Sequence, residues 1–265
     1  MLKRLDPDTR DRTSIDADTR SRLRRWNVAA AVLHAGSAAA MLALATDFSI
    51  PVTLVTGGQP GAGLDQRSLQ SVVDVPLAPL VASFMVLSAA FHALVAAPGM
   101  FGRYLDELAR GRNRFRWAEY ALSSTVMIVA IALITSLTDI TALIAIAAAN
   151  VAMILFGWIM EMVNPPGEKV WWTPFWFGTI AGAAPWLSLG ALLLVSAGES
   201  PPTFVYGILV SIFLLFNCFA VNQFLQYRGI GPWRDYLWGE RAYIVLSFAA
   251  KSALAWQVYA NVLVG

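Results

Sequence analysis

Seven apolar runs, each about 20 residues long, divide this 265-residue sequence into hydrophobic segments and polar connections. Only 14% of the residues are charged, whereas soluble domains carry about 25%. A run of about 20 apolar residues is long enough to cross a bilayer as a helix. The sequence therefore predicts an all-α membrane protein, a bundle of seven transmembrane helices. The expected spans are residues 23–46, 76–97, 117–137, 139–163, 174–196, 202–226 and 237–264.

The positive charges are distributed very unevenly over the connections between these spans. Seventeen of the nineteen lysines and arginines lie on the side of the N-terminus, against Arg67 alone on the opposite side and Lys251 within a span. Cytoplasmic connections of membrane proteins carry the excess of lysine and arginine. We therefore expect a multi-pass protein of the cell membrane with a cytoplasmic N-terminus and an extracellular C-terminus. Residues 1–22 are expected to form a charged cytoplasmic tail ahead of a single bundle domain, 23–265. Residues 1–25 lack the apolar core of a signal peptide.

The connection 47–75, between the first two spans, has a pattern of its own. Two segments rich in β-branched residues, 50–55 and 68–73, flank a glycine-rich stretch at 57–63. This pattern is typical of two strands joined by a turn. We expect a small extracellular β-hairpin; a disordered linker is the alternative, which the apolar content of both arms disfavours. An exposed strand edge would also suit a dimer contact.

Lys251 is the only lysine within a hydrophobic span. An ammonium at the centre of a membrane helix costs about 2.5–3.5 kcal/mol, so such a residue is a functional candidate by default. A buried lysine can also form a Schiff base with a carbonyl compound. The alternative, a lysine that reaches an aqueous surface, does not suit so central a position.

Glu119, in the third span, is the best candidate for the partner of Lys251. Its depth in the bundle, counted along the helix, is similar to that of Lys251. Arg116 precedes it by three residues, so we expect the helix to begin before Arg116 and the arginine to reach the inner surface. The alternative for Glu119 is a carboxylate that merely stabilises the start of its helix.

The only two histidines, His34 and His92, fall in the first and second spans. Two histidines without a cysteine or carboxylate nearby supply too few ligands for a metal site, and Cys218 is the only cysteine. Buried imidazoles need polar partners. We therefore expect a polar cavity in the cytoplasmic half that includes Ser88, one turn before His92; the alternative is two separately satisfied histidines.

Small, sulfur-containing and aromatic residues recur at helical spacing near this pair. The third span places Ser123 and Met127 on the stripe of Glu119, and the seventh places Ser247 one turn before Lys251. Such stripes are usually plain packing. Together with the aromatic residues of the fifth and sixth spans, they predict a slot for a flat apolar chromophore. The fourth span adds a further stripe: Asn150, Met153 and Gly157.

Seven spans with a central lysine in the last resemble the microbial rhodopsins, and the orientation resembles that of the heliorhodopsin branch. The local sequences that carry the resemblance are Arg25-Trp26-Asn27, Trp117-Ala118-Glu119-Tyr120, Pro174-Phe175-Trp176-Phe177-Gly178, Asn222-Gln223-Phe224-Leu225-Gln226-Tyr227 and Ser247-Phe248-Ala249-Ala250-Lys251-Ser252. The resemblance covers nearly the whole chain after the tail.

The resemblance implies roles for the residues singled out above. Lys251 would carry all-trans retinal as a protonated Schiff base, with Glu119 as its counterion and Ser247 beside it. His34 and His92 would lie in a hydrated cavity. The expected lining of the chromophore is Ser123, Met127, Asn150, Met153, Gly157 and Phe216, the last at a position where pump-type rhodopsins usually have tryptophan. The resemblance also implies a homodimer.

The expected function is that of a photoreceptor with a slow photocycle that signals through its conformation. A light-driven proton pump or light-gated channel is the alternative, disfavoured because the third span has no second carboxylate between Glu119 and Asp139. A small-solute transporter would suit the buried ion pair but not the aromatic slot. The expected partners are retinal, the lipid bilayer, a second copy of the chain and a signalling partner that the sequence does not identify. Neither nucleic acid binding nor enzymatic activity is expected.

Overall fold

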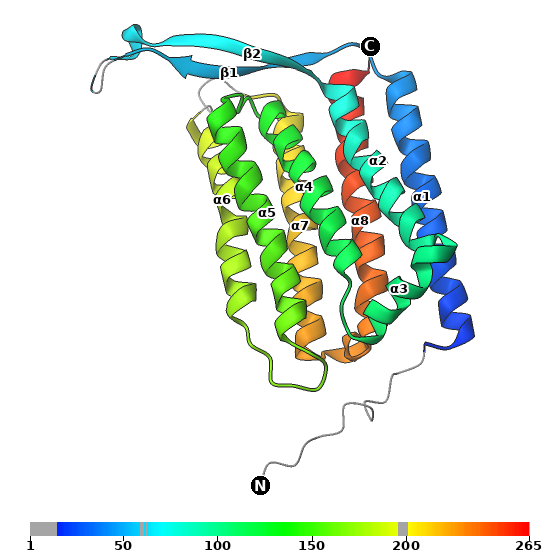
Figure 1. The fold of residues 1–265 in the computed structure, drawn as a ribbon. Helices are drawn as coiled ribbons and strands as arrows, with labels where there is room; N and C mark the ends of the chain where they lie inside the picture. The colour runs from blue at the N-terminus through cyan, green and yellow to red at the C-terminus, as the bar shows by residue number, and fades with distance from the viewer. Residues whose placement is uncertain (1–14, 59–60, 62, 196–200, 265) are drawn as a thin grey trace.

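Seven long helices lie side by side as a bundle, with a two-stranded hairpin across one end and a short helix, α3, at the other (Figure 1). The computed structural model describes residues 15–58, 61, 63–195 and 201–264, so most of the expected tail, 1–14, lies outside the described residues. The predicted fold class is confirmed. The seven helices are α1 (Ala17–Leu44), α2 (Leu77–Ala96), α4 (Arg114–Ile134), α5 (Ile140–Val163), α6 (Thr173–Val195), α7 (Thr203–Arg228) and α8 (Tyr236–Val258).

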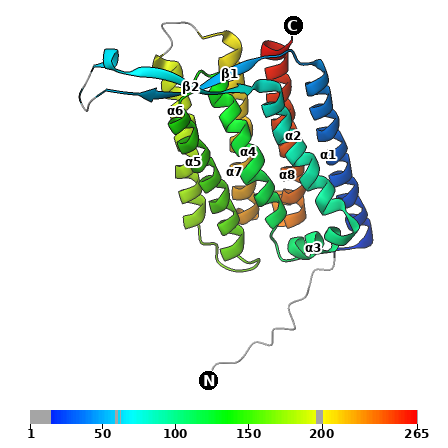
Figure 2. The same cartoon turned by 45° about the horizontal axis from the view of Figure 1, so that its top comes forward.

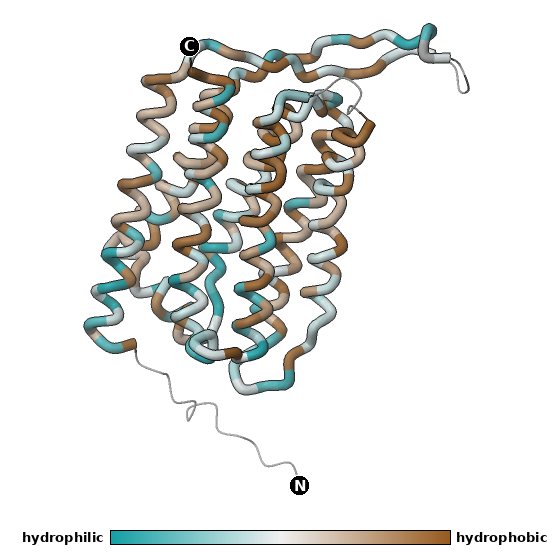
Figure 3. Tube along the Cα trace, turned by 180° about the vertical axis from the view of Figure 1, so that it is seen from behind, coloured by the Kyte–Doolittle hydropathy of each residue, from teal (hydrophilic) through white to brown (hydrophobic). Residues whose placement is uncertain are grey.

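Six of these helices are long and apolar enough to cross a membrane, within the described part of the chain. The seventh, α8, is less apolar because it carries Glu240, Arg241 and Lys251. A π-helical turn, Tyr259–Leu263, follows α8. The hydrophilic residues gather towards the end opposite the hairpin, whereas the middle of the bundle is mostly hydrophobic (Figure 3).

Helix α1 begins six residues before the expected start of the first span. The Asp16 side chain accepts a hydrogen bond from the Thr19 backbone N–H (2.9 Å) and so caps the helix. A side-chain acceptor at this position satisfies one of the N–H groups that a helix start leaves free. Residues 17–22, which we expected in the tail, therefore belong to the helix.

Strands β1 (Ser49–Thr56) and β2 (Ser68–Pro76) form the expected antiparallel hairpin, with a bulge between Val52 and Thr53. β1 is anchored to the bundle beside the bulge. The backbone N–H of Thr53 donates to the carbonyl of Thr138 (2.9 Å), and the two threonine hydroxyls lie 3.0 Å apart. Beyond this anchor the hairpin extends over the bundle and past α6 (Figures 1 and 2).

Helix α3 (Pro98–Ala109) was not predicted from the sequence. Its buried side chains Tyr104, Leu105 and Leu108 pack with Leu23 of α1 and Val95 of α2. Pro98 at its first turn suits a helix start. The segment is only twelve residues long and includes Arg103. Its sequence therefore predicts a polar connection rather than a further helix.

The hairpin-side half of the bundle is closed by apolar packing. Leu254 and Val258 of α8, Ile131 of α4 and Ile212 of α7 are fully buried there in one cluster, together with Met41 of α1. Buried carboxylates, by contrast, lie in the other half, towards α3. Among the described residues these are Glu107, Glu119, Glu161 and Glu240.

Candidate functional site

Lys251 and Glu119 form an ion pair in the interior of the bundle. The Lys251 Nζ lies 3.0 Å from Glu119 Oε1, and both side chains are almost completely buried. Lys251 also donates to the hydroxyl of Ser247, one helical turn earlier (2.6 Å), and lies over the ring of Tyr120. The structure therefore brings together the lysine, the carboxylate and the serine that the sequence singled out.

A second donor holds the Glu119 carboxylate from the side of α2. The Ser88 hydroxyl donates to Glu119 Oε1 (2.5 Å) and lies within reach of the carbonyl of Phe84 (3.1 Å). Hydrogen bonds to a charged acceptor are stronger than those between neutral groups. The carboxylate is thus fixed by Ser88 and Lys251 together, which positions its negative charge beside the amine.

A large cavity of about 620 Å³ extends from Lys251 between α4, α5, α6 and α7. Its size falls in the range of sites that bury a whole small molecule. Seven of the residues expected at a chromophore line it: Ser123, Met127, Met153, Gly157, Phe216, Ser247 and Lys251. The remaining walls are mainly aromatic or apolar and include Trp117, Tyr120, Pro174, Phe175, Trp186, Phe213, Phe219 and Tyr243.

Glycines make room for the aromatic walls of this cavity. A Cβ at Gly157 would lie 2.5 Å from the ring of Trp117, closer than carbon atoms can approach without a shift. A Cβ at Gly182 of α6 would likewise collide with the side chain of Met153. The cavity therefore depends on small residues, and its mainly aromatic and apolar lining suits an apolar group that reaches the Lys251 amine.

Asn150 does not line this cavity, although the sequence placed it on the stripe of Met153 and Gly157. Its side-chain amide donates to the hydroxyls of Ser124 and Thr125 (2.9 Å each). Asn150 thus joins α5 to α4 behind the cavity wall. A one-dimensional stripe covers a wide arc of a helix, so it does not separate a lining residue from one that holds the wall in place.

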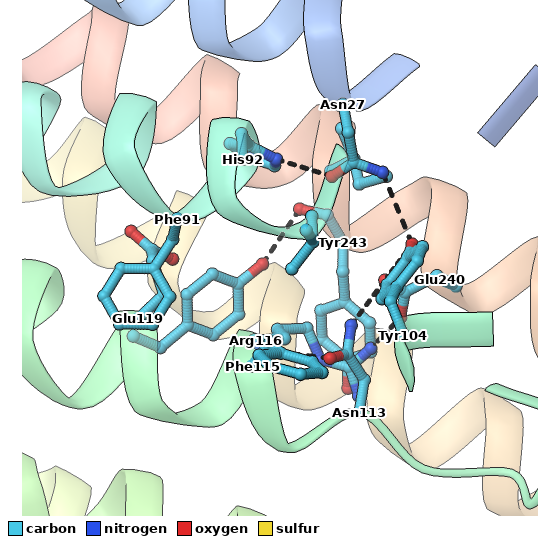
Figure 4. A pocket seen from close by; sticks show the side chains of 13 residues that line it. Asn27, Phe91, His92, Tyr104, Asn113, Phe115, Arg116, Glu119, Glu240 and Tyr243 are labelled. Atoms are coloured by element: carbon cyan, nitrogen blue, oxygen red, sulfur yellow. Dashed lines mark hydrogen bonds and ion pairs between the residues drawn. The ribbon is translucent and has the colours of Figure 1, made fainter. Parts of the chain in front are cut away.

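The two histidines lie together next to a small cavity of about 30 Å³ with polar groups in its wall, called the small polar cavity below. Their rings stack with centroids 5.8 Å apart, and His92 Nδ1 lies 2.8 Å from Asn27 Oδ1. His92 and Glu119 line the cavity. His34 does not line it and is fully buried. Ser88 does not line it either, but donates a hydrogen bond to Glu119. Figure 4 shows Asn27 between His92 and Tyr104.

Arg116 is buried, and our expectation that it reaches the inner surface is wrong. Its guanidinium forms ion pairs with Glu161 of α5 and Glu240 of α8 and lies over the ring of Tyr243, 4.0 Å from the centroid. The ion pairs with these two carboxylates, one from α5 and one from α8, keep the guanidinium in the interior instead of at the aqueous surface. We call Arg116, Glu161 and Glu240 the arginine cluster.

Sequence reasoning missed Glu240 and Tyr243 as site residues. Both lie at the start of the seventh span, where Glu240 is an acidic residue within a segment that already contains Arg241 and Lys251. That excess of charge in one span was a usable signal. Tyr243 gave none, because the bond that its backbone carbonyl accepts from the Tyr120 hydroxyl (3.0 Å) appears only in the fold.

Solved structures with a similar fold include a light-driven proton pump and a cyanorhodopsin. A light-driven proton pump from Leptosphaeria maculans has a TM-score of 0.60 at 14% identity, over 90% of this chain and 94% of the other. Cyanorhodopsin from the cyanobacterium Tolypothrix sp. NIES-4075 has a TM-score of 0.51 at 13% identity, over 91% and 92% of the two chains. At such low identity these likenesses show the fold alone. Comparison with curated proteins gives no match.

The family is shown by the sequence itself. A family model described as Heliorhodopsin matches residues 23–263, which is nearly the whole chain and includes Lys251, Glu119 and all residues that line the large cavity. The chain therefore belongs to the heliorhodopsin family, and with it to the retinal-binding photoreceptors of the membrane.

Proposed function

We propose that the protein is a light sensor in which all-trans retinal is attached to Lys251 and Glu119 serves as the counterion. The observation that carries this proposal is the position of the Lys251–Glu119 pair at the large aromatic cavity. Retinal, bound through its aldehyde carbon to Lys251 Nζ, would supply the absorption of visible light and a change of shape on absorbing it.

The residues around the pair hold charge and geometry in place. Ser247 orients the Lys251 nitrogen, and Ser88 orients the Glu119 carboxylate. The negative charge on Glu119 stabilises a positive charge at the Lys251 nitrogen, since a carboxylate in contact favours the protonated form. Trp117, Met127, Met153 and the other walls would exclude water from a bound retinal, and Gly157 keeps space free beside the Trp117 ring.

The proposed output is a change of conformation rather than the pumping of an ion. A pump needs proton-exchanging groups on both sides of the Lys251 nitrogen. The buried carboxylates of the described chain lie on the side of α3, whereas apolar side chains such as Leu254 and Val258 fill the hairpin side. Movement of a proton is therefore expected within one half of the bundle. A slow photocycle belongs to the same proposal.

We place the α3 end of the bundle in the cytoplasm and the hairpin outside, on the basis of the uneven basic charges. Exposed apolar residues on the hairpin, among them Leu69 and Val73, support a homodimer in which the hairpin takes part. The proposal assigns the protein no enzymatic reaction. Its signalling partner would meet either the α3 end or the hairpin.

The decisive experiment compares Lys251→Ala with Lys169→Ala after addition of all-trans retinal. Lys169 is exposed in the connection between α5 and α6 and serves as the matched control. Wild type and Lys169→Ala should gain a visible absorption band, whereas Lys251→Ala should not. A visible band in folded Lys251→Ala would contradict attachment at this residue.

Recording the pH of an illuminated cell suspension separates the sensor from the pump. The sensor proposal predicts no sustained change in external pH when the cells carry the pigmented protein. A light-dependent change that a protonophore abolishes would establish pumping and refute this part of the proposal.

A further inference from the structure

We propose that the arginine cluster is a proton-binding site, in which Glu161 and Glu240 together hold one proton in the dark. All three members are at least nine-tenths buried, with exposures of 6% for Arg116, 4% for Glu161 and 2% for Glu240. The cluster is separate from the Lys251–Glu119 pair, where one cation meets one carboxylate.

The charges of the cluster do not balance without a proton. One guanidinium faces two carboxylates, which leaves a net charge of −1 in the interior. The nearby arginines are engaged elsewhere: Arg112 and Arg114 pair with Glu107, and Arg241 pairs with Asp235. An uncompensated buried charge is costly, and two carboxylates that share one site favour retaining a proton.

Other titratable side chains face the cluster from the elements packed around it, and none of them adds a second positive charge. They are Tyr104 from α3, Tyr120 and Glu119 from α4, Tyr236 and Tyr243 from α8, and His92 from α2, with Tyr227 of α7 bonded to the neighbouring carbonyl of Met160. His92 lies across the small cavity next to Asn27, where its partner is an amide oxygen rather than a carboxylate.

The hydrogen bonds favour Glu240 as the carrier of the proton. Glu161 accepts from four donors, and three of these have no acceptor capacity: the Arg116 guanidinium, the Asn113 backbone N–H and the Trp117 indole. Glu240 accepts from Arg116 at one oxygen and meets Asn113 Nδ2 (2.7 Å) and the Tyr104 hydroxyl (3.2 Å) at the other.

The contact with Tyr104 can reverse, because a hydroxyl both donates and accepts. A proton on Glu240 Oε1 would then be donated to the Tyr104 oxygen, while Oε2 continues to accept from Arg116. At Glu161 the one donor that could reverse, the Tyr236 hydroxyl, shares Oε1 with the Arg116 guanidinium, and both partners of Oε2 only donate.

The small polar cavity links this site to the counterion. Glu119 and Glu240 both line its wall, whereas Glu161 does not (Figure 4). Its volume of about 30 Å³ exceeds the roughly 10–15 Å³ that one water requires. A proton can thus pass between the two carboxyl groups through this cavity, and the charge on one is felt by the other. This second step rests on the proposed function, whereas the dark proton does not.

Infrared spectroscopy of the full-length protein without retinal tests the proton directly. Wild type at neutral pH should show the carbonyl band of a buried carboxylic acid, shifted in D₂O, which disappears as the pH is raised. In Glu240→Gln the intensity of this band should fall by the contribution of one carboxyl group. Glu161→Gln should lose it too, because a single remaining carboxylate balances Arg116. Glu107→Gln, buried at the same end but matched to several surface arginines, should keep it.

Absence of the band in wild type would overturn the proposal without any variant, so misfolding of a mutant cannot obscure the result. A band that survives in both folded glutamine variants, or that is lost only in Glu119→Gln, would also overturn it. Because the dark measurement needs no retinal, it can succeed while the proposed photoreceptor function fails. With retinal bound, illumination should change the same band; an unchanged band would refute the link through the small cavity alone.

Discussion

Ser88 Oγ lies 2.5 Å from Glu119 Oε1, the same oxygen that lies 3.0 Å from the Lys251 nitrogen. Ser88 belongs to α2 and Lys251 to α8, so a single carboxylate oxygen of Glu119 in α4 connects three helices. Any change of charge or position at Lys251 is transmitted to this oxygen first. Variants at Glu119 and Ser88 should therefore report on the same contact with different strengths.

Glu119→Gln should move the visible band of the retinal-loaded protein to longer wavelength. As the pH is raised and the Lys251 nitrogen loses its proton, the band should also disappear at a lower pH than in wild type. Removing one partner of a buried ion pair costs about 3–5 kcal/mol, which corresponds to about 2–4 pH units in the midpoint of band loss. Ser88→Ala should shift the midpoint in the same direction by about 1 unit, as a charged hydrogen bond contributes less than the pair. Spectra recorded against pH check both; equal midpoints in all three proteins would exclude Glu119 as the counterion.

Gly157→Ala should disturb the large cavity, because its new Cβ would lie 2.5 Å from the Trp117 ring. Overpacking of this kind costs about 1–3 kcal/mol, and the displaced ring should alter both the Tm and the visible maximum. Gly190→Ala on α6 is the control, since its Cβ would meet no atom within 4 Å. A visible maximum that moves equally in both variants would contradict a role of Gly157 in shaping the cavity.

Asp139, in the turn before α5, should contribute a pH-dependent part of the stability. Its pKa is lowered by the hydrogen bond from the Thr141 hydroxyl and by the backbone N–H groups of Ala142 and Thr141. A lowered folded-state pKa means that the stabilisation is complete above the ordinary value near 4 and is lost as the pH falls through the folded-state pKa.

Asp139→Asn should accordingly have a lower Tm than wild type at neutral pH, with a difference that shrinks below about pH 4. Asp106→Asn, at an exposed position on α3, is the comparison for loss of a surface charge. A Tm difference between wild type and Asp139→Asn that stays constant from neutral to acid pH would refute the charged cap.

The proposed orientation can be tested with single cysteines in a Cys218→Ser background, since Cys218 is the only native cysteine. Arg67→Cys, beside the hairpin, should react with a membrane-impermeant maleimide on intact cells. Arg103→Cys, on α3, should react only after the cells are opened. The reverse pattern would place the N-terminus outside and overturn the charge argument.

Sequence patterns were sufficient for the bundle because each long helix must satisfy its own backbone in lipid, which makes an apolar run a reliable signal. The β-branched arms of the hairpin were equally informative. Helix α3 escaped notice since it does not cross the bilayer, and its burial depends on contacts with Leu23 and Val95 from distant segments.

At the site, Lys251 and Glu119 were identifiable because an isolated charge in an apolar span requires a partner. Arg116 was misjudged because it lies near the expected start of its span, where an arginine can reach water. Its two carboxylate partners come from α5 and α8, and the sequence does not show that these helices bring them to Arg116. The difference between Asn150, behind the cavity wall, and Met153, within it, lies in helix rotation. Rotation is set by packing between helices, which a periodic pattern in one of them does not record.

The anchoring of β1 gives the hairpin a mechanical property. Thr53 fastens the strand to the turn between α4 and α5, and Thr46, just before it, bonds to the carbonyl of Leu263 beyond α8. Under the proposed function, a relative shift of α4 and α8, the two helices that carry Glu119 and Lys251, would pull on the strand at these two contacts. The part of the hairpin beyond Thr53 is long and extends past α6. A small displacement of the strand near Thr53 would therefore become a larger displacement at the far end of the hairpin.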